Sequence, residues 1–413
     1  MALRGGGRLL IAVGTVVVGG TGWSIWDRAA SPILYVDDDA PSGGDGAAWS
    51  TAFSDLQEAI DRAEPGAEIR VAAGRYRPDR GSNEREASFG LQSGVSISGG
   101  FAGLVGDDPD ERDPLRFATI LTGEIGVEGI RDDNSMHVVT SGFGVDATAV
   151  LDGFIIRDGY SDRFGAGLLV HGGAPTIRRC VFEGLEAYAG AAVFNRHSDT
   201  RFESCRFEDN LAVVRGAAVY TVESSPTFVD CQFVANDSYE GGSAIYSVGG
   251  DIVITDCSFT RNRADQKGAA LFNAVGQPLI TNCTFDGNES AEGAAYYHDS
   301  GLGAFENCVF TANHATNRGG AVAVRNGFPT FRGCRFLSNG AVSQGGAIFN
   351  ERGRFDLLDC VFSRNKADIG HAIFTDVIAV SRLKDCTIEP DDRVAFAGSG
   401  DSILLEGEDD ADQ

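Results

Sequence analysis

The amino-acid sequence predicts an all-β protein: a single right-handed parallel β-helix with a short capping helix near its N-terminal end. Three observations carry this prediction, namely evenly spaced cysteines, a short motif around each cysteine, and a Gly-Ala segment after each motif. Successive cysteines lie 25 or 26 residues apart, and a period in this range indicates a protein built of stacked coils. The nine cysteines are Cys180, Cys205, Cys231, Cys257, Cys283, Cys308, Cys334, Cys360 and Cys386.

Each cysteine belongs to a motif with an apolar residue three positions before it, phenylalanine two positions after it (Ile388 in the last coil) and asparagine five positions after it. Side chains alternate between the faces of a strand, so residues three apart share a face only if the chain turns between them. The motif therefore predicts two short strands, with one corner at the cysteine and another at the asparagine. Asparagine suits a corner because it tolerates left-handed backbone and bonds nearby backbone groups. Leu185 replaces it in the first coil, and the others are Asn210, Asn236, Asn262, Asn288, Asn313, Asn339 and Asn365.

A third strand is expected about ten residues after each cysteine, in segments such as Gly190-Ala-Ala-Val-Phe194. Three parallel strands then complete each coil of about 26 residues, and parallel crossovers are overwhelmingly right-handed.

The Gly-Ala segments also suggest a candidate binding face. Their fourth and fifth positions are both apolar, yet neighbouring residues on a strand cannot share a face. We favour aromatic residues of the fifth position inside, with the aliphatic fourth and polar sixth positions outside. The outer stripe would then be a flat binding face, because long exposed apolar rows usually mark interaction sites. The alternatives are a stripe covered by loops, or an inverted strand whose outer aromatic row would stack against sugar rings. The polar row comprises Asn195, Thr221, Ser247, Asn273, His298, Arg325, Asn350 and Thr375.

The sequence divides into an N-terminal segment, a long β-helix and a tail. Residues 1–31 place two arginines before an apolar run, which is typical of an export signal or an uncleaved N-terminal anchor. The β-helix is expected over residues 32–400, with irregular coils over 66–150 and regular coils over 151–390. Residues 401–413 read as an acidic, solvated tail.

Two local patterns extend the prediction towards the N-terminus. Counting back 26 residues from Cys180 reaches Phe154, which takes the place of the cysteine in an earlier coil. Ser54-Asp-Leu-Gln57 resembles a capping box that opens a short helix before Pro65. Such a helix would cover the open end of the stack.

Charge and cysteine chemistry exclude several kinds of partner. A net charge of −25 argues against nucleic acid, which requires a basic surface. Coils stack about 4.8 Å apart, whereas a disulfide requires Cβ atoms about 3.5–4.5 Å apart, so we expect a row of buried free thiols. Phenylalanine and aliphatic neighbours do not make a metal site, and no cofactor motif is present.

The motifs resemble two known patterns. Phe362-Ser-Arg-Asn365 and Gly345-Gly-Ala-Ile348 resemble the FxxN and GGA[ILV] motifs of chlamydial polymorphic outer-membrane proteins within the parallel β-helix repeat family. Tyr35-Val-Asp-Asp-Asp39, Trp49-Ser-Thr-Ala-Phe53 and Ile69-Arg-Val-Ala-Ala-Gly-Arg-Tyr76 are similar to the opening module of secreted β-helix proteins of planctomycete-like bacteria. The resemblance implies a fold more strongly than a function, because this scaffold carries adhesins, lyases and hydrolases.

The expected function is that of an exported, non-catalytic β-solenoid with an adhesive, structural or glycan-binding role. It would be extracellular, at the cell surface or periplasmic, with a polysaccharide or another surface protein as partner, and would touch a membrane only through an uncleaved N-terminal segment. The alternative is a polysaccharide lyase or glycoside hydrolase that uses the long face of the helix. A catalytic coil should break the repeat, so an active site would lie in the irregular residues 75–175.

Overall fold

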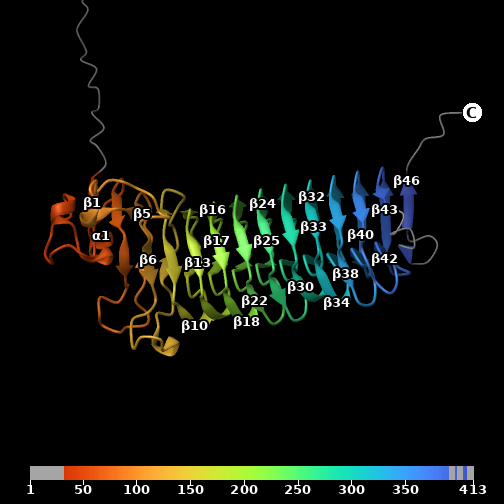
Figure 1. Cartoon of the computed structure of the whole chain (residues 1–413), viewed down its shortest axis with the longest axis horizontal. Coiled ribbons are helices and arrows are strands. Elements are labelled where there is room, and N and C mark those ends of the chain that lie inside the picture. Colours follow the sequence, from red (N-terminus) through yellow and green to blue (C-terminus); the bar gives the residue numbers. More distant parts are fainter. Residues whose placement is uncertain (1–31, 390–395, 398–402, 407–413) are drawn as a thin grey trace, which may run out of the picture. The chain divides into compact units, whose positions relative to one another are not determined.

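The computed structural model describes residues 32–389, 396–397 and 403–406, through which four parallel sheets run. From β8 to β39 the chain passes in each coil through sheets A, B, D and C and returns to sheet A one coil further along, and the next coil has no strand in sheet D (Figure 1). The expected export segment, residues 1–31, lies outside the described residues. Within the described ranges, no helix is long and apolar enough to cross a membrane.

Sheets A and B carry the two strands of the cysteine motif, and equivalent residues of successive coils lie side by side. Ile177 is opposite Phe202 in sheet A, for example. Sheet A consists of β1 (Ile33–Val36), β2 (Glu68–Ala72), β5 (Ser96–Phe101), β8 (Val150–Asp152), β12 (Thr176–Arg178), β16 (Arg201–Glu203), β20 (Thr227–Val229), β24 (Val253–Thr255), β28 (Leu279–Thr281), β32 (Leu302–Glu306), β36 (Phe328–Arg332), β40 (Arg354–Leu358), β43 (Val380–Lys384) and β46 (Ile403–Glu406). Sheet B consists of β3 (Gly74–Tyr76), β6 (Thr119–Thr122), β9 (Ile155–Arg157), β13 (Val181–Glu183), β17 (Arg206–Glu208), β21 (Gln232–Val234), β25 (Ser258–Thr260), β29 (Thr284–Asp286), β33 (Val309–Thr311), β37 (Arg335–Leu337), β41 (Val361–Ser363) and β44 (Thr387–Ile388).

Sheet C carries the strand that follows the Gly-Ala corner. It consists of β4 (Phe89–Gly90), β7 (Val139–Ser141), β11 (Leu168–His171), β15 (Val193–Arg196), β19 (Val219–Val222), β23 (Ile245–Val248), β27 (Leu271–Asn273), β31 (Tyr296–His298), β35 (Val322–Val324), β39 (Ile348–Asn350), β42 (Ile373–Thr375) and β45 (Phe396–Ala397).

Sheet D is a fourth strand per coil, which the sequence analysis did not anticipate. Its inward residues are small, as at Ala187, Ala212 and Ser238, and small residues carry a weak strand signal. It consists of β10 (Tyr160–Phe164), β14 (Glu186–Ala189), β18 (Leu211–Arg215), β22 (Asp237–Ser238), β26 (Arg263–Ala264), β30 (Glu289–Glu292), β34 (His314–Arg318) and β38 (Gly340–Ala341).

Two corners of each coil depend on left-handed backbone, at the residue before the cysteine and at the residue before the asparagine. Asp230 (φ +54°) precedes Cys231, and Ala235 (φ +52°) precedes Asn236. The asparagine itself is therefore not the left-handed residue, contrary to our expectation. It holds the corner through its side chain instead.

The asparagines form a continuous buried ladder, as the sequence predicts. The side-chain amide of Asn262 donates to the backbone oxygen of Phe233 and to Oδ1 of Asn288, each at 3.0 Å. Its own Oδ1 accepts from the backbone N–H and the side-chain amide of Asn236, at 3.1 and 2.9 Å. Each corner is thus bonded to the coil on either side, which satisfies polar groups that burial would otherwise leave costly.

The core consists of aligned rows of one residue type. Phenylalanines two residues after the cysteines stack face to face, with Phe233, Phe259 and Phe285 at successive centroid distances of 4.7 Å. The cysteines are free, and all are buried except the half-buried Cys386. Burial raises the pKa of the Cys180 thiol to about 12. A reactive thiol needs an accessible site, which the buried cysteines of this row lack.

The first coils follow the same plan less regularly. Leu151 is opposite Ile177 and Ile156 is opposite Phe182, which places Phe154 in the cysteine row as predicted. At the other end, β46 pairs with β43. The β-helix therefore includes residues 403–406, which we had placed in the acidic tail.

The N-terminal end carries the predicted helix, α1 (Leu56–Arg62), and the described residues also contain three single-turn helices, η1 (Trp49–Thr51), η2 (Gly103–Val105) and η3 (Arg131–Asp133). The cap of α1 is Asp55, whose carboxylate accepts from the backbone N–H of Glu58 at 2.8 Å, rather than Ser54. Leu56 and Ile60 are buried in the main core. The helix therefore closes the end of the stack, as expected.

Candidate functional site

The polar row predicted to face outwards lies inside the core. Seven of its eight members are fully buried, and the predicted orientation is wrong for them. The physical reason is the corner: Gly190 (φ +61°) and the two alanines after it turn the chain, so the strand begins with Val193 pointing inwards. Alternation then places the aromatic residue outside and the polar residue inside. The seven buried residues are Asn195, Thr221, Ser247, Asn273, His298, Asn350 and Thr375.

Arg325 is the eighth member, and it does not belong to the row. The strand register pairs Tyr297 with Ala323 and His298 with Val324. The left-handed glycine of this coil is Gly319 (φ +64°), so the Gly-Ala segment begins one residue earlier than the sequence motif predicted. Arg325 is exposed beyond the end of the strand, where it pairs with Asp299 at 3.2 Å.

The buried polar row holds the corner between sheets C and A. His298 Nδ1 accepts from the hydroxyl of Tyr296 (2.5 Å), and its Nε2 faces the backbone oxygen of Gly301 (3.2 Å). A carbonyl oxygen only accepts, so Nε2 carries the proton. Burial lowers the pKa of His298, which keeps the ring neutral. These residues serve packing and hydrogen bonding inside the coil.

The aromatic row on the outer side of sheet C is largely covered as well. Tyr246 and Phe272 are each 8% exposed and stack at 4.3 Å. Arginine and lysine side chains from the end of sheet D lie over the rings, as Arg215 does over Tyr246 at 5.0 Å. The expectation of a long, open stripe for stacking sugar rings is therefore not met in either orientation.

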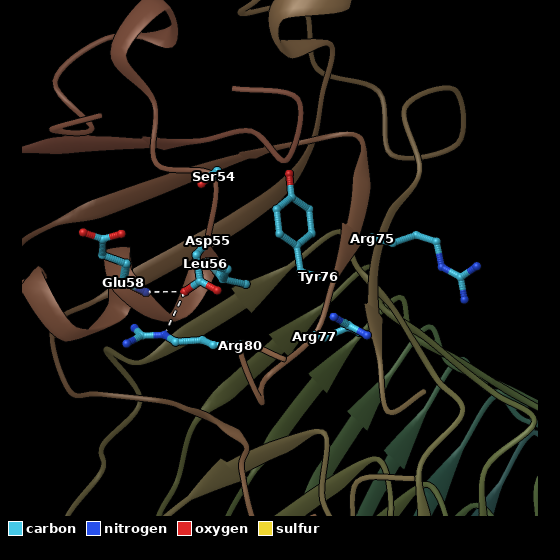
Figure 2. A pocket seen from close by; sticks show the side chains of 8 residues that line it. All are labelled: Ser54, Asp55, Leu56, Glu58, Arg75, Tyr76, Arg77 and Arg80. Atoms are coloured by element: carbon cyan, nitrogen blue, oxygen red, sulfur yellow. Dashed lines mark hydrogen bonds and ion pairs between the residues drawn. The ribbon is translucent and has the colours of Figure 1, made fainter. Parts of the chain in front are cut away.

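A polar cleft of about 400 Å³ lies instead beside β3 in the irregular coils (Figure 2). Tyr76 points into the core, where its hydroxyl donates to the backbone oxygen of Ala72 at 3.1 Å. Because side chains alternate along a strand, Arg75 and Arg77 point outwards and are exposed. We call this the arginine cleft, and its lining is Ser54, Asp55, Leu56, Glu58, Arg75, Tyr76, Arg77 and Arg80.

The three arginines differ in how far they are already engaged. Arg80 donates to Asp55 at 3.1 Å and to Asp61 at 2.8 Å. Figure 2 shows Arg80 directed towards Asp55, whereas Arg75 extends away from both. Arg75 and Arg77 approach a carboxylate only at 3.8 and 3.9 Å, and their guanidinium groups make no hydrogen bond within the described residues. Their N–H donors are available to a ligand.

A second cleft of about 360 Å³ adjoins the first and shares Arg75 and Arg77. Its other wall contains Glu124 and Glu128, so the charges there balance. The arginine cleft has three arginines against two carboxylates, and Asp55 is engaged by Arg80 and by the helix N-terminus. An anion is therefore favoured on the α1 side of β3.

Residues 133–285 and 268–407 match the family described as the right-handed β-helix region, over more than half of the chain. The chain belongs to this right-handed β-helix family. No curated protein matches its sequence.

Three solved structures resemble this β-helix protein at low identity. Pectate lyase Pel9A is 12% identical, with a TM-score of 0.43 over 81% of this chain and 78% of its own. A GH136 lacto-N-biosidase from Eubacterium ramulus is 9% identical, with a TM-score of 0.34 over 91% and 68%. A family 28 exopolygalacturonase from Yersinia enterocolitica is 8% identical, with a TM-score of 0.32 over 92% and 79%. We transfer neither substrate nor reaction from them.

Asp37, Asp38 and Asp39 of the β-helix protein form a cluster of three neighbouring carboxylates. Ligand oxygens of Asp37, Asp38 and Asp39 lie within 4.8 Å of one another. Asp37 accepts from the backbone N–H groups of Asp39 (3.0 Å) and Leu104 (2.7 Å), and Asp38 accepts from that of Arg75 (2.9 Å). These bonds fasten the first loops around β3.

Arg75 and Arg77 were not predicted as site residues, although any active site was expected in residues 75–175. The segment ending at Tyr76 served only as a marker of the fold. The available signal was Arg-Tyr-Arg at the end of a predicted strand, because the period of two places both arginines on the face opposite the buried tyrosine.

Proposed function

We propose that the protein is an exported, non-catalytic β-solenoid that binds an anionic polysaccharide at the arginine cleft. The single observation that carries this proposal is the pair Arg75 and Arg77, whose guanidinium groups lie on the same side of β3 and make no hydrogen bond within the described residues. The planar fork of arginine matches carboxylate and sulfate groups, which it binds in bidentate fashion.

The charge of the whole chain limits where an anionic polysaccharide can bind. A net charge of −25 repels polyanions from most of the surface. A polyanion that binds must therefore be held by a local site rather than by the general field.

The export and envelope part of the proposal rests on residues 1–31 and on the two resemblances described above. The FxxN and GGA[ILV] motifs and the N-terminal module are typical of secreted or surface β-helix proteins. N-terminal sequencing of the protein recovered from its native envelope or medium tests this part. A start at residue 1 in a cytoplasmic fraction would contradict it.

The binding part is tested with residues 32–413 and matched polymers. Isothermal titration calorimetry should give saturable binding of dextran sulfate or alginate and none of neutral dextran. Arg75→Gln with Arg77→Gln should weaken this binding at least tenfold. Arg335→Gln should leave it unchanged, because Arg335 is an exposed, outward residue of the same sheet and forms no ion pair within the described part of the chain.

Equal losses from both variants would show a general charge effect and overturn the site. New reducing ends or unsaturated products in the same mixtures would overturn the non-catalytic assignment. That result would favour the lyase or hydrolase alternative.

A further inference from the structure

Two exposed tyrosines lie on the outer side of sheet D. The chain contains nine tyrosines, and Tyr188 (48% exposed) and Tyr239 (56% exposed) are the two that are open to solvent, whereas the others are buried or half-buried. Within the described residues, neither ring stacks on another ring or lies under a cation, and neither hydroxyl makes a hydrogen bond. Both side chains are therefore available to a ligand.

The strand register places these tyrosines in one row, two coils apart. Ala187, Ala212 and Ser238 are buried, equivalent residues of three successive coils. Because side chains alternate along a strand, the residue that follows each of them faces outwards. We call these outward residues the tyrosine row, which consists of Tyr188, Val213 and Tyr239.

The space between the two rings is open. Val213 lies between them and is 57% exposed, and Leu211 on the same strand is 43% exposed. Coils repeat every ~4.8 Å, so the tyrosines are two such repeats apart and the row runs along the axis of the β-helix. A group of exposed apolar side chains of this kind usually marks an interaction site.

The charged side chains around the tyrosine row balance one another. At one end of the row, Asp162 and Arg163 are both exposed and carry opposite charges. The other pairs are Glu186 with Arg131, Asp237 and Asp265 with Arg263 at 3.2 and 2.8 Å, and Glu240 with Arg215 at 2.6 Å. Since neither sign of charge is left to attract a charged ligand, the row favours a neutral one.

An extended chain of β-1,4-linked neutral hexoses fits both the spacing and the charge of the row. A hexose ring has a face of C–H groups, and packing this face on an aromatic ring removes apolar surface from water. In such a chain each sugar advances by roughly one coil spacing and is turned over relative to the sugar before it. Alternate sugars therefore present the same face, at the spacing of Tyr188 and Tyr239. The phenolic hydroxyls can bond the sugar hydroxyls.

We propose that the tyrosine row binds an extended, neutral β-1,4-linked polysaccharide that lies along the axis of the β-helix. The rings of Tyr188 and Tyr239 stack on alternate sugars, and the sugar between them lies over Val213. This site differs from the arginine cleft in its sheet, its residues and the charge of its ligand, and it does not rest on the proposed function.

The small number of tyrosines makes a direct test possible. In protein labelled with 3-fluorotyrosine, titration with cellohexaose should shift the ¹⁹F NMR signals of Tyr188 and Tyr239 saturably and leave the other tyrosine signals unchanged. Tyr188→Phe and Tyr239→Phe each remove one signal and so assign it. Maltohexaose contains the same sugars in a curved, α-linked chain, and it should bind at least fivefold more weakly.

The length of the oligosaccharide tests the spacing of the two rings. Cellotetraose reaches both tyrosines, whereas cellobiose reaches one. Isothermal titration calorimetry should therefore show affinity rising at least tenfold from cellobiose to cellotetraose, and at most threefold from cellotetraose to cellohexaose. An even rise with every added sugar would contradict a site built on two rings.

Alanine variants test the tyrosines themselves. Tyr188→Ala and Tyr239→Ala should each weaken cellohexaose binding at least fivefold. Val342→Ala should leave it unchanged, because Val342 is an exposed residue that follows β38 in a distant coil of the same sheet. All three residues lie on the surface, so the variants should keep the melting temperature of the parent protein.

Several outcomes would overturn the site. They are the absence of saturable cellohexaose binding, equal binding of the two hexasaccharides, equal shifts at all tyrosines, and unchanged binding in both tyrosine-to-alanine variants. Slower sedimentation of the unliganded Tyr188→Ala variant than of the parent protein would show that the row is a contact between copies of the chain, and this result would also reject the proposal.

Arg75→Gln with Arg77→Gln separates this proposal from the proposed function. Cellohexaose binding should persist in that variant, and binding of dextran sulfate should persist in Tyr188→Ala. Loss of cellohexaose binding in the arginine variant would place the neutral chain in the arginine cleft and reject the tyrosine row.

Discussion

The coils after residue 151 and those before it share the same sheets but differ in what their side chains contact. In the regular coils a residue packs against the equivalent residue of the neighbouring coil, as Phe259 does against Phe233 and Phe285. The described first coils have no ladder of stacked phenylalanines or asparagines, and the guanidinium groups of Arg75 and Arg77 make no hydrogen bond there. Repetition satisfies polar and apolar groups internally, so the arginine cleft lies where these ladders are absent.

Phe259→Ala should produce the largest loss of stability. It removes a fully buried ring that stacks on two neighbours, and such a change costs about 4 kcal/mol. Urea denaturation followed by circular dichroism measures it. Thr284→Ala, on the exposed side of the same sheet, should change stability by less than about 0.5 kcal/mol, and a similar loss in both would contradict the role of the stack.

Asn262→Ala should cost about 3 kcal/mol, because it leaves buried donors of Asn236 and the backbone oxygen of Phe233 without partners. The same denaturation assay applies, with Gln232→Ala on the exposed side of sheet B as control. A loss below about 1 kcal/mol would mean that the ladder contributes little beyond packing.

Asp55→Ala should cost about 1 kcal/mol, since it removes the cap of α1 at the irregular end. Asp55→Ser keeps a capping oxygen and should recover most of the loss. If both variants unfold alike, the contact of Asp55 with Arg80 rather than the cap would be responsible.

Ala235→Gly should be the smallest effect, a gain of about 0.5 kcal/mol. Ala235 has φ +52°, and Gly184 and Gly287 occupy the same corner in other coils. Relief of left-handed strain outweighs the extra backbone entropy of glycine in the unfolded chain. Ala212→Gly, inside a strand, should instead destabilise, and a loss in both variants would refute the argument.

Much of the fold could be predicted because one period controls it. The intervals between cysteines set the coil length, and the three-residue offsets from the apolar residue to Cys and from Phe to Asn located two corners. The strands of sheet D were not predicted because their inward positions are Ala and Ser. These small side chains pack close to the corner but give only a weak alternation in hydrophobicity.

The candidate sites were harder to predict for a different reason. The alternation of side chains along the strand showed that Val193 and Asn195 share a face. It did not show whether that face is inside or outside, because this depends on the left-handed turn at Gly190. Arg75 and Arg77 gave a period-two signal only, and whether their guanidinium groups are hydrogen-bonded depends on the three-dimensional packing. The outward position of Ala323 could be known only from the strand register, because the corner of its coil begins at Gly319, one residue earlier than predicted.

The direction of the asparagine ladder has a consequence for the order of assembly. Every amide from Asn210 to Asn339 donates to an oxygen in the coil that follows it in the chain. A ribosome therefore makes each donor before its acceptor, and a growing chain always ends in a corner that awaits the next coil. Truncation within the regular coils should leave that waiting corner and its open strand edges on the new C-terminal end, where a second molecule can add to them.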